Sequence, residues 1–357
     1  MDATLDLYVD YLISWTSQVS ATGLSRITNN MVSHDKITRL LSSRQYTAAD
    51  LWKVAKPIYN EIVSCDGALV VDDTIEEKQY TDENDIIAWH FDHAKKRTVK
   101  GINFLTSLYV AEKGSLPVGY KIVEKTEIVI DDKGKKKRKS KISKNEHCRN
   151  LVRAACQNNL IFKYVLTDNW FSSAENMKFI KISCNRDFIM GLKSNRIVTL
   201  SEEDKKIGKF VGIDSLEPGV GILVWLKGVE FPLRLAIQHF KNEDGSTGTR
   251  YLGSSNIELT FGQIIAIYHK RWKVETYHLS LKSNHSLAKS PTRTIRSQSN
   301  HIFASMCAYI RLEFISLTTG KNHFKLKNMI YLEATKRAFS ELAKFQHPQN
   351  FQSLVEN

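Results

Sequence analysis

The sequence predicts an α/β protein in which a mixed sheet flanked by helices is interrupted by a β-rich insertion and preceded by a helical region. Three observations predict this class. Residues 1–60 favour helices, residues 61–192 begin with three strand-like runs and then alternate helices with strands, and residues 193–258 are rich in short strands. Residues 259–357 return to helical periodicity and are assigned to the second part of the α/β domain.

The N-terminal 60 residues are expected to contain a helix-turn-helix. Helical segments at 24–30 and 34–41 are separated by a short break, and Ser33 is placed to cap the second helix. That helix would present His34, Lys36 and Arg39 to DNA. Short helical pairs are equally common in proteins that bind no DNA, so the pattern leaves a structural role open.

The central region supplies the strands of the predicted sheet. We expect strands at 67–73, 102–112, 115–124, 162–167 and 187–192, and helices at 145–158 and 173–182. Asp73 ends the first of these strands, and Asp168 follows the fourth. Ligands of open α/β sheets gather outside the carboxyl ends of strands, so these two carboxylates are expected to meet in one crevice. The alternative for each is an Asp that caps the next turn, which needs no metal.

The stretch between Asp168 and Glu275 is far longer than one connecting loop in a compact domain. It holds strand-like segments at 221–226 and 231–240 and a turn at 243–245, so we expect an insertion of strands outside the α/β layer. Thr260 and Gln263 form a capping box that is expected to start the helix carrying Glu275. The chain is then expected to close with helices at about 298–318 and 325–344.

A late helix carries Tyr268, Arg271, Glu275 and Lys282 at offsets of 0, 3, 7 and 14. At about 100° per residue all four side chains fall within roughly 60° of one another. A carboxylate for a metal ion, flanked by two cations and a phenol for phosphate oxygens, is what a metal-dependent phosphodiester site needs. The alternative is a solvated helix face on which Arg271 and Glu275 form an i,i+4 pair.

The charge balance suits a polyanionic partner. The chain has 357 residues, 51 Lys plus Arg against 38 Asp plus Glu, and a formal net charge of +13. Basic ribosomal and membrane-surface proteins have a similar balance. The start of the chain has no signal-like pattern and no apolar run reaches ~18 residues, which predicts a soluble cytoplasmic protein. The five cysteines form no CxxC pair and are expected to be reduced thiols.

One run stands out for its positive charge. Residues 133–144 contain eight basic residues and no acidic one, and include Lys135, Lys136, Lys137 and Arg138. Such runs are usually solvated loops. The position of this run, directly before the helix that leads to Asp168, also favours non-specific contacts with DNA phosphates.

These residues resemble the DDE transposases of bacterial insertion sequences, specifically the cut-and-paste branch with the Y-R-E-K signature. The likeness spans roughly residues 24–310 and rests on Tyr268-x2-Arg271-x3-Glu275-x6-Lys282, on Asp73-Thr74 after a strand, and on Asp168-Asn169-Trp170 after another. The family places its catalytic Asp directly before Thr, which selects Asp73 over the adjacent Asp72. Side chains of adjacent strand residues point to opposite faces, so this choice matters for the geometry of the site.

The resemblance implies a ribonuclease-H-like fold and two Mg²⁺ ions, with Mn²⁺ as a substitute, held by Asp73, Asp168 and Glu275. It implies cleavage and strand transfer of double-stranded DNA at transposon ends, a homodimer in the synaptic complex, and a cytoplasmic, nucleoid-associated location. Related enzymes cut the second strand through a hairpin with a base flipped onto an aromatic surface, for which Trp170 and Trp225 are candidates. A metal-dependent nuclease of the same fold and a catalytically inactive DNA-binding descendant are the two alternatives.

Overall fold

The structure is a computed structural model that describes residues 2–93, 95–130, 132, 134–217, 219, 221–241 and 244–346. Its helices are α1 (Ala3–Ser14), α2 (Ala21–Ile27), α3 (His34–Ser42), α4 (Ala48–Ile62), α5 (Lys144–Gln157), α6 (Ala174–Lys178), α7 (Glu202–Lys206), α8 (Phe261–His269), α9 (Trp272–Asn284), α10 (Ile295–Thr319) and α11 (His323–Gln346). A π-helical turn, η1 (Phe179–Ser183), follows α6, and two 3-10 turns are η2 (Ile213–Ser215) and η3 (Leu287–Lys289).

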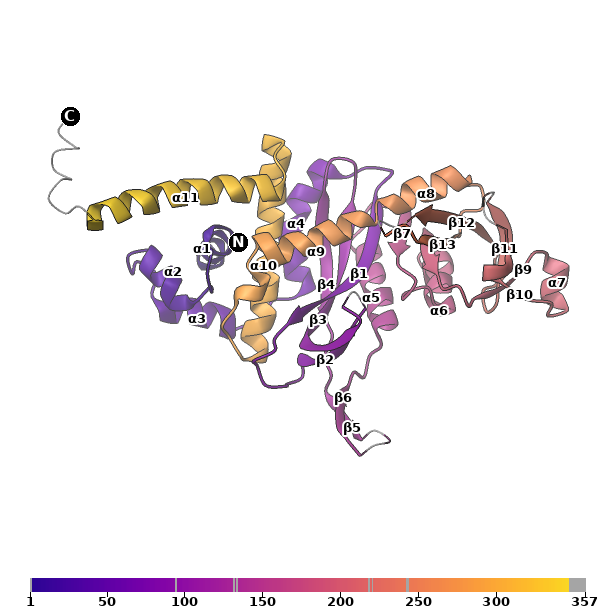
Figure 1. Cartoon of the computed structure of the whole chain (residues 1–357), viewed down its shortest axis with the longest axis horizontal. Coiled ribbons are helices and arrows are strands. Elements are labelled where there is room, and N and C mark those ends of the chain that lie inside the picture. Colours follow the sequence, from indigo (N-terminus) through magenta and orange to yellow (C-terminus); the bar gives the residue numbers. More distant parts are fainter. Residues whose placement is uncertain are drawn as a thin grey trace.

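The strands are β1 (Ala68–Glu77), β2 (Ile87–Asp92), β3 (Arg97–Val110), β4 (Ser115–Ile122), β5 (Glu127–Ile130), β6 (Lys136–Lys139), β7 (Tyr164–Thr167), β8 (Asp187–Leu192), β9 (Ile197–Thr199), β10 (Val211–Gly212), β11 (Ile222–Leu226), β12 (Leu233–Lys241) and β13 (Thr247–Ser254). Eleven of them form one mixed sheet in the order β10-β9-β11-β12-β13-β8-β7-β1-β3-β2, with β4 also paired to β3. The predicted α/β class, a mixed sheet flanked by helices, is confirmed (Figure 1).

The strand that carries the first two acidic residues is β1, which lies between β7 and β3 in the sheet. It pairs antiparallel with β3 along its whole length and parallel with β7 over Ala68–Val70 only. Its first residues, from Ala68 to Val71, are fully buried, because this apolar β-branched run is covered on both faces. Since β7 stops at Thr167, β1 extends past the end of its neighbour and carries the next residues, Asp72 and Asp73, to the edge of a crevice.

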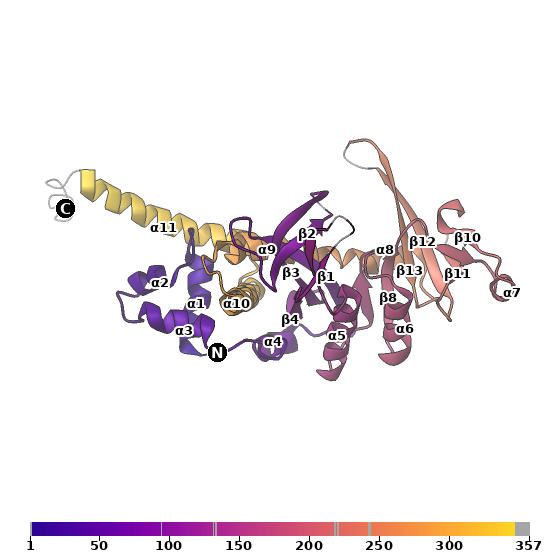
Figure 2. The same ribbon diagram turned by 90° about the horizontal axis from the view of Figure 1, so that it is seen from below.

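The strands of residues 193–258 do not form a separate layer, and this part of the prediction is wrong. The last of them, β13, pairs antiparallel with β8, so β9 to β13 continue the same sheet (Figure 2). The expected turn at 243–245 includes Glu243, which lies outside the described residues. Sequence periodicity could not reveal this pairing, because a β-rich insertion has the same local pattern whether it extends a sheet or forms a new one.

The helix expected to carry Tyr268 through Lys282 is divided into α8 and α9. The predicted capping box of Thr260 and Gln263 is present, but it starts α8 and not the helix of Glu275. Between the helices, the Lys270 N–H donates to the Ile267 carbonyl and the Arg271 N–H to the Tyr268 carbonyl, at 3.1 and 2.9 Å. Such three-residue spacing tightens the backbone at the junction, and Tyr268 leaves the stripe of the other side chains.

The basic run is not a plain loop. Lys136–Lys139 form β6, which pairs with β5 as a two-stranded hairpin that projects from the body of the molecule (Figure 1). Arg138 donates to the Asp85 carboxylate at 2.8 Å, which fixes the base of the hairpin. The first residue of the run, Lys133, lies outside the described residues.

The terminal helices pack together beside the sheet. The predicted helix-turn-helix corresponds to α2 and α3, with the Ser33 side chain accepting from the Lys36 N–H as the predicted N-cap. The long helix α10 contacts α1, α3 and α4, and α11 projects past it (Figure 1). By length and composition α10 is long and apolar enough to cross a membrane, but 61% of its most apolar stretch is buried inside the protein, as in a core helix. The five cysteines are free, as predicted.

Candidate active site

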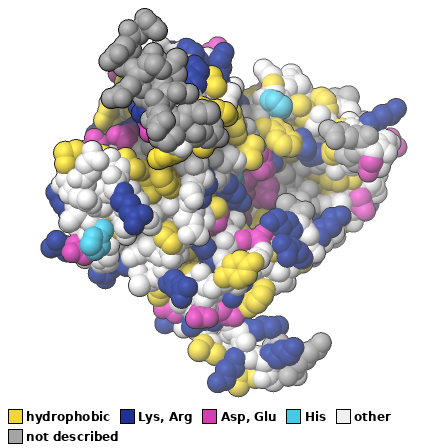
Figure 3. Space-filling view, turned by 60° about the vertical axis from the view of Figure 1, so that its left-hand side comes forward, with side chains coloured by type: hydrophobic (Ala, Val, Ile, Leu, Met, Phe, Trp, Pro, Cys, Tyr) yellow, Lys and Arg dark blue, Asp and Glu magenta, His cyan; other side chains and the backbone are white. Residues whose placement is uncertain are grey.

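Acidic side chains from two strands and one helix line a common cavity of about 1080 Å³. Asp72 and Asp73 come from β1, Asp168 directly follows β7, and Glu275 lies on α9, which crosses β1. Figure 3 shows acidic side chains in a hollow of the surface with Lys and Arg beside them. The cavity is also lined by His93, Lys144, Trp170, Lys193, Arg271, His278 and Lys282. The crevice expected at the strand ends is therefore present.

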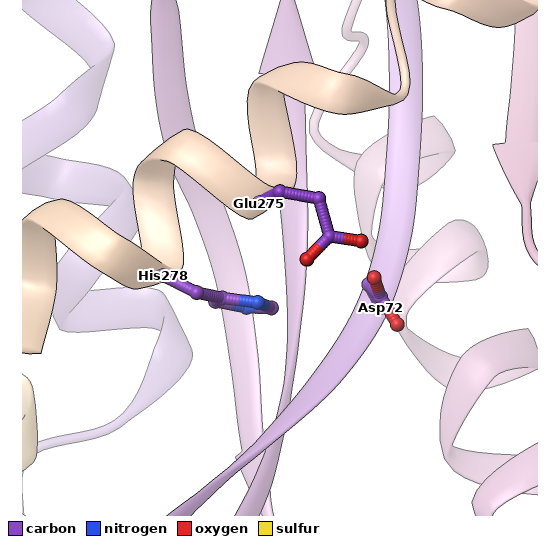
Figure 4. Close-up of side chains that lie close together, drawn as sticks. All are labelled: Asp72, Glu275 and His278. Atoms are coloured by element: carbon purple, nitrogen blue, oxygen red, sulfur yellow. The ribbon is translucent and has the colours of Figure 1, made fainter. Parts of the chain in front are cut away.

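On the α9 side of β1, Arg271 bridges two carboxylates. Its Nη1 lies 3.3 Å from Asp72 Oδ2 and 3.3 Å from Glu275 Oε1. A ring nitrogen of His278 and the carboxylate oxygens of Asp72 and Glu275 lie within 4.8 Å of one another (Figure 4). The i,i+4 pair of Arg271 and Glu275 is present. The Arg271 side chain is only 14% exposed and also contacts Asp72, so this pair is not simply a solvated one.

Asp73 has different partners. Lys144 Nζ, at the start of α5, lies 2.7 Å from Asp73 Oδ2, and the side-chain amide of Asn103 donates to the same oxygen. The two contact sets agree with strand alternation, which directs adjacent side chains to opposite faces. Of these two carboxylates, Asp72 is the one that lies within 4.8 Å of the Glu275 carboxylate, whereas Asp73 lines the same cavity from the side of α5.

Asp168 is held by its own turn. Its Oδ1 accepts from the Trp170 N–H at 3.0 Å, which is the local turn geometry expected of an Asp after a strand. Burial raises the pKa of Asp168, and the negative charge of Asp73 raises it further, while the Trp170 N–H and Arg271 lower it. After burial, Asp168 raises the pKa of Asp72 more than any other neighbouring charge does, and both carboxylates line the cavity.

Burial and mutual repulsion disfavour the charged forms of two of these carboxylates, Asp72 and Asp168. Burial raises the pKa of Asp72 well above its ordinary value, and Asp168, Asp73 and Glu275 act in the same direction against Arg271. Burial alone would lower the pKa of Arg271, but Tyr268, Asp72 and Glu275 together raise it. Two partly buried carboxylates with raised pKa values, beside two further carboxylates in one cavity, are an arrangement that a divalent cation stabilises.

Two members of the predicted stripe have distinct positions. Lys282 lines the cavity and lies on α9, about two helical turns after Glu275. Tyr268 is buried, and its hydroxyl donates to the Thr167 carbonyl at 3.2 Å, directly before Asp168. A contact between Tyr268 and phosphate would therefore require this hydrogen bond to break.

An aromatic surface forms one wall of the cavity. Trp170 is 42% exposed, and its ring lies 5.3 Å from that of His93 and beneath the ammonium groups of Lys193 and Lys144, at 5.3 and 5.8 Å. Phe91 contacts His93 in an edge-to-face arrangement, with the ring centroids 4.9 Å apart. The other sequence candidate, Trp225, is on β11 in the extended part of the sheet.

The remaining predicted DNA contacts lie away from the cavity. Lys135, Lys136 and Lys137 are exposed on the hairpin, and Arg138 is half-buried against Asp85. Lys36 and Arg39 are exposed on α3, where they line a second hollow together with Arg44 and Lys53.

Sequence reasoning set aside Asp72, which lies near Glu275, and missed three polar residues of the site: Asn103, Lys144 and His278. Of these three, His278 gave a local signal, because it lies three residues after Glu275 and therefore on the same face of a helix. Asn103 and Lys144 meet Asp73 through β3 and α5, and pairing between distant segments leaves no trace in local spacing.

A mixed sheet with carboxylates at two strand ends and a third on a crossing helix defines a nucleic-acid-processing enzyme of the ribonuclease-H-like class. Residues 1–205 match the family described as DDE superfamily endonuclease, and residues 118–311 match the transposase DDE domain. Each match covers more than half of the chain, so the protein belongs to the DDE transposase and endonuclease superfamily, whose members are metal-dependent DNA-cleaving enzymes. No match was found among curated proteins.

Proposed function

We propose that this protein is a transposase of the cut-and-paste branch with the Y-R-E-K signature, which cleaves DNA at insertion-sequence ends and joins those ends to a target. The observation that carries the proposal is the convergence of Asp73, Asp168 and Glu275 on one cavity with Arg271 and Lys282. This arrangement combines the acidic groups needed for metal-dependent phosphoryl transfer with cations for phosphate oxygens.

Divalent cations fit this cavity. The carboxylates of Asp72 and Asp168 have raised pKa values, and protein cations, Arg271 and Lys144, already lie against the acidic groups. We propose that two ions, Mg²⁺ or in its place Mn²⁺, are held by Asp73, Asp168 and Glu275, with Asp72 as a further ligand beside Glu275. When bound, such ions activate the attacking oxygen and stabilise the leaving oxygen of an in-line displacement.

The chain's own residues would position the DNA. Arg271 and Lys282 offer charge to phosphate oxygens from α9, and Tyr268 supports the strand end that carries Asp168 through its bond to Thr167. The exposed face of Trp170, with Lys193 beside it, suits an unpaired base and its phosphate. Formation of a DNA hairpin would require such a site for the flipped base. This placement in the cavity wall favours Trp170 over Trp225.

Two surfaces outside the cavity favour duplex binding. On the β5–β6 hairpin, Lys135, Lys136, Lys137 and Arg138 would contact phosphates without regard to sequence, and Lys36 and Arg39 on α3 would contact the transposon end.

In this proposal the protein is soluble and cytoplasmic and acts on the DNA of the nucleoid. We propose that it works as a homodimer that pairs two ends, with exposed apolar residues on α11 as the candidate contact.

A product assay tests the proposal against its closest alternative. Purified protein is incubated with linear DNA carrying the cognate end, a supercoiled target plasmid, and Mg²⁺. A transposase releases a 3′-hydroxyl end and produces end–plasmid joints, whereas a metal-dependent nuclease produces cleavage without joints. Binding of the end with neither product would identify an inactive DNA-binding descendant. Glu275→Gln is the matched control that must abolish both products.

A further inference from the structure

The environment of His278 is unusual for a histidine in a protein core. Its side chain is only 7% exposed, yet its Nε2 has no hydrogen-bond partner among the described residues. A buried polar atom without a partner is destabilising, so such atoms normally bind water, an ion or another protein group. In Figure 4 the ring extends from α9 toward the space between Asp72 and Glu275.

The spacing of these groups suits a single cation. One ring nitrogen of His278 and the carboxylate oxygens of Asp72 and Glu275 lie within 4.8 Å of one another. Ligands of one ion at ~2.1 Å each lie ~3 to ~4.2 Å apart, so small side-chain rotations would bring all three into range. Arg271 already places a positive charge against both carboxylates, which shows that cationic charge is accommodated here.

We propose that His278 is a nitrogen ligand of the divalent ion held by Asp72 and Glu275. This inference rests on the proposed function, which supplies the ion, and it adds a mixed nitrogen and oxygen donor set on the α9 side of β1. Imidazole suits transition-metal ions, whereas Mg²⁺ takes oxygen ligands and keeps its waters. The site beside Glu275 therefore binds Mn²⁺ in preference to Mg²⁺, and removal of the imidazole reduces this preference.

Spectroscopy of the full-length protein loaded with Mn²⁺ tests the assignment without relying on activity. Electron spin-echo spectra of the wild type are expected to show ¹⁴N modulation from a bound imidazole. The modulation should disappear in His278→Gln and persist in His285→Gln, which removes another buried histidine whose Nε2 lacks a partner. Titration should show Mn²⁺ affinity reduced about tenfold or more in His278→Gln, with Mg²⁺ affinity changed much less.

The outcomes separate this inference from the proposed function. Bound Mn²⁺ without ¹⁴N modulation in the wild type would overturn the assignment of His278 and leave the carboxylate site intact. The same conclusion follows if His278→Gln, shown to be folded by its circular dichroism melt, retains the wild-type ratio of Mn²⁺ to Mg²⁺ affinity. Absence of any Mn²⁺ binding to the wild type would overturn both the metal-dependent function and the role of His278.

Discussion

Asp72 and Asp73 show how a shift of one residue along a strand changes which carboxylate faces Glu275. The two side chains alternate across β1, so Asp72 meets Arg271 and the Glu275 side of the cavity, and Asp73 meets Lys144 and Asn103. The sequence identifies both carboxylates and their strand. It cannot tell which one faces Glu275, because that depends on where α9, about 200 residues further along the chain, crosses the sheet.

The first prediction concerns the carboxylates. Asp73→Asn, Asp168→Asn and Glu275→Gln should each abolish cleavage and leave binding of the DNA end nearly unchanged, because metal ligands act in chemistry more than in recognition. Asp72→Asn should also reduce cleavage strongly, since Asp72 lies beside Glu275. Single-turnover cleavage in Mg²⁺ and gel-shift binding measure the two effects. Near wild-type cleavage by any variant would remove that residue from the site.

A second prediction uses the raised pKa of Asp168. Burial raises this pKa above its ordinary value of 3.8, so the protonated carboxyl favours the folded protein. Its contribution to the free energy of unfolding is complete below pH ~4 and is lost as pH rises through the folded pKa. In metal-free buffer Asp168→Asn should therefore match the wild type near pH 4 and melt a few degrees higher at pH 7. Equal melting temperatures at both pH values would contradict this explanation.

At the scale of elements, the junction of α8 and α9 explains an error of prediction. The 3.6-residue pattern runs without interruption from Tyr268 to Lys282, so the sequence indicates one helix. The backbone instead tightens at Lys270 and Arg271, where N–H groups donate to carbonyls three residues back. Arg271 is thereby placed at the start of α9, where its guanidinium reaches both Asp72 and Glu275.

The third prediction tests what this junction provides. Arg271→Ala and Lys282→Ala should impair hairpin formation and its resolution more than the first nick, because those steps reposition the cut end against the cavity wall. Arg271→Lys should restore only part of the loss, since an ammonium lacks the planar fork with which a guanidinium binds two phosphate oxygens. Lys273→Ala, at an exposed position of the same helix, is the control. Time courses of nicked, hairpin and double-strand-break products decide, and wild-type ratios in both alanine variants would exclude the role.

A fourth prediction belongs to the β5–β6 hairpin. Neutralising Lys135, Lys136, Lys137 and Arg138 together should weaken binding to all DNA sequences. It should also reduce the slope of log affinity against log salt concentration by up to the contribution of about four phosphate contacts. Preference for the cognate end should hardly change. Log affinity against log salt concentration measures the slope, with exposed Lys206 and Lys209 neutralised as the control. An unchanged slope in the hairpin variant would show that these charges do not contact DNA.

At the scale of the whole molecule, local patterns predicted most elements and few of their partners. The runs that became β1, β4, β7 and β8 and the helices α5, α10 and α11 were evident from periodicity and caps. The sheet order was not, because β13 pairs with β8 and β1 with β7 through segments distant in sequence. The acidic site was found as a set of residues, whereas its inner contacts, Asn103, Lys144 and His278, required the assembled sheet.

The last prediction concerns assembly. The first half of α11 packs against the body, where Leu326 and Lys327 are buried, while the second half projects away from it (Figure 2). Phe339 and Leu342 are 69% and 50% exposed there and lie on one face with Leu332. Exposed apolar groups of this size in a row favour a protein contact, and pairing of two DNA ends gives a second copy of this chain as the partner.

Phe339→Glu combined with Leu342→Glu should leave the melting temperature of the single chain nearly unchanged, because both side chains already contact water. Binding of one DNA end should persist, while the complex that contains two ends and two chains should be lost. Light scattering of the DNA-bound protein measures its mass, and Lys336→Glu, on another exposed position of α11, controls for added charge. A two-chain complex that survives in the double variant would place the contact between copies elsewhere on the molecule.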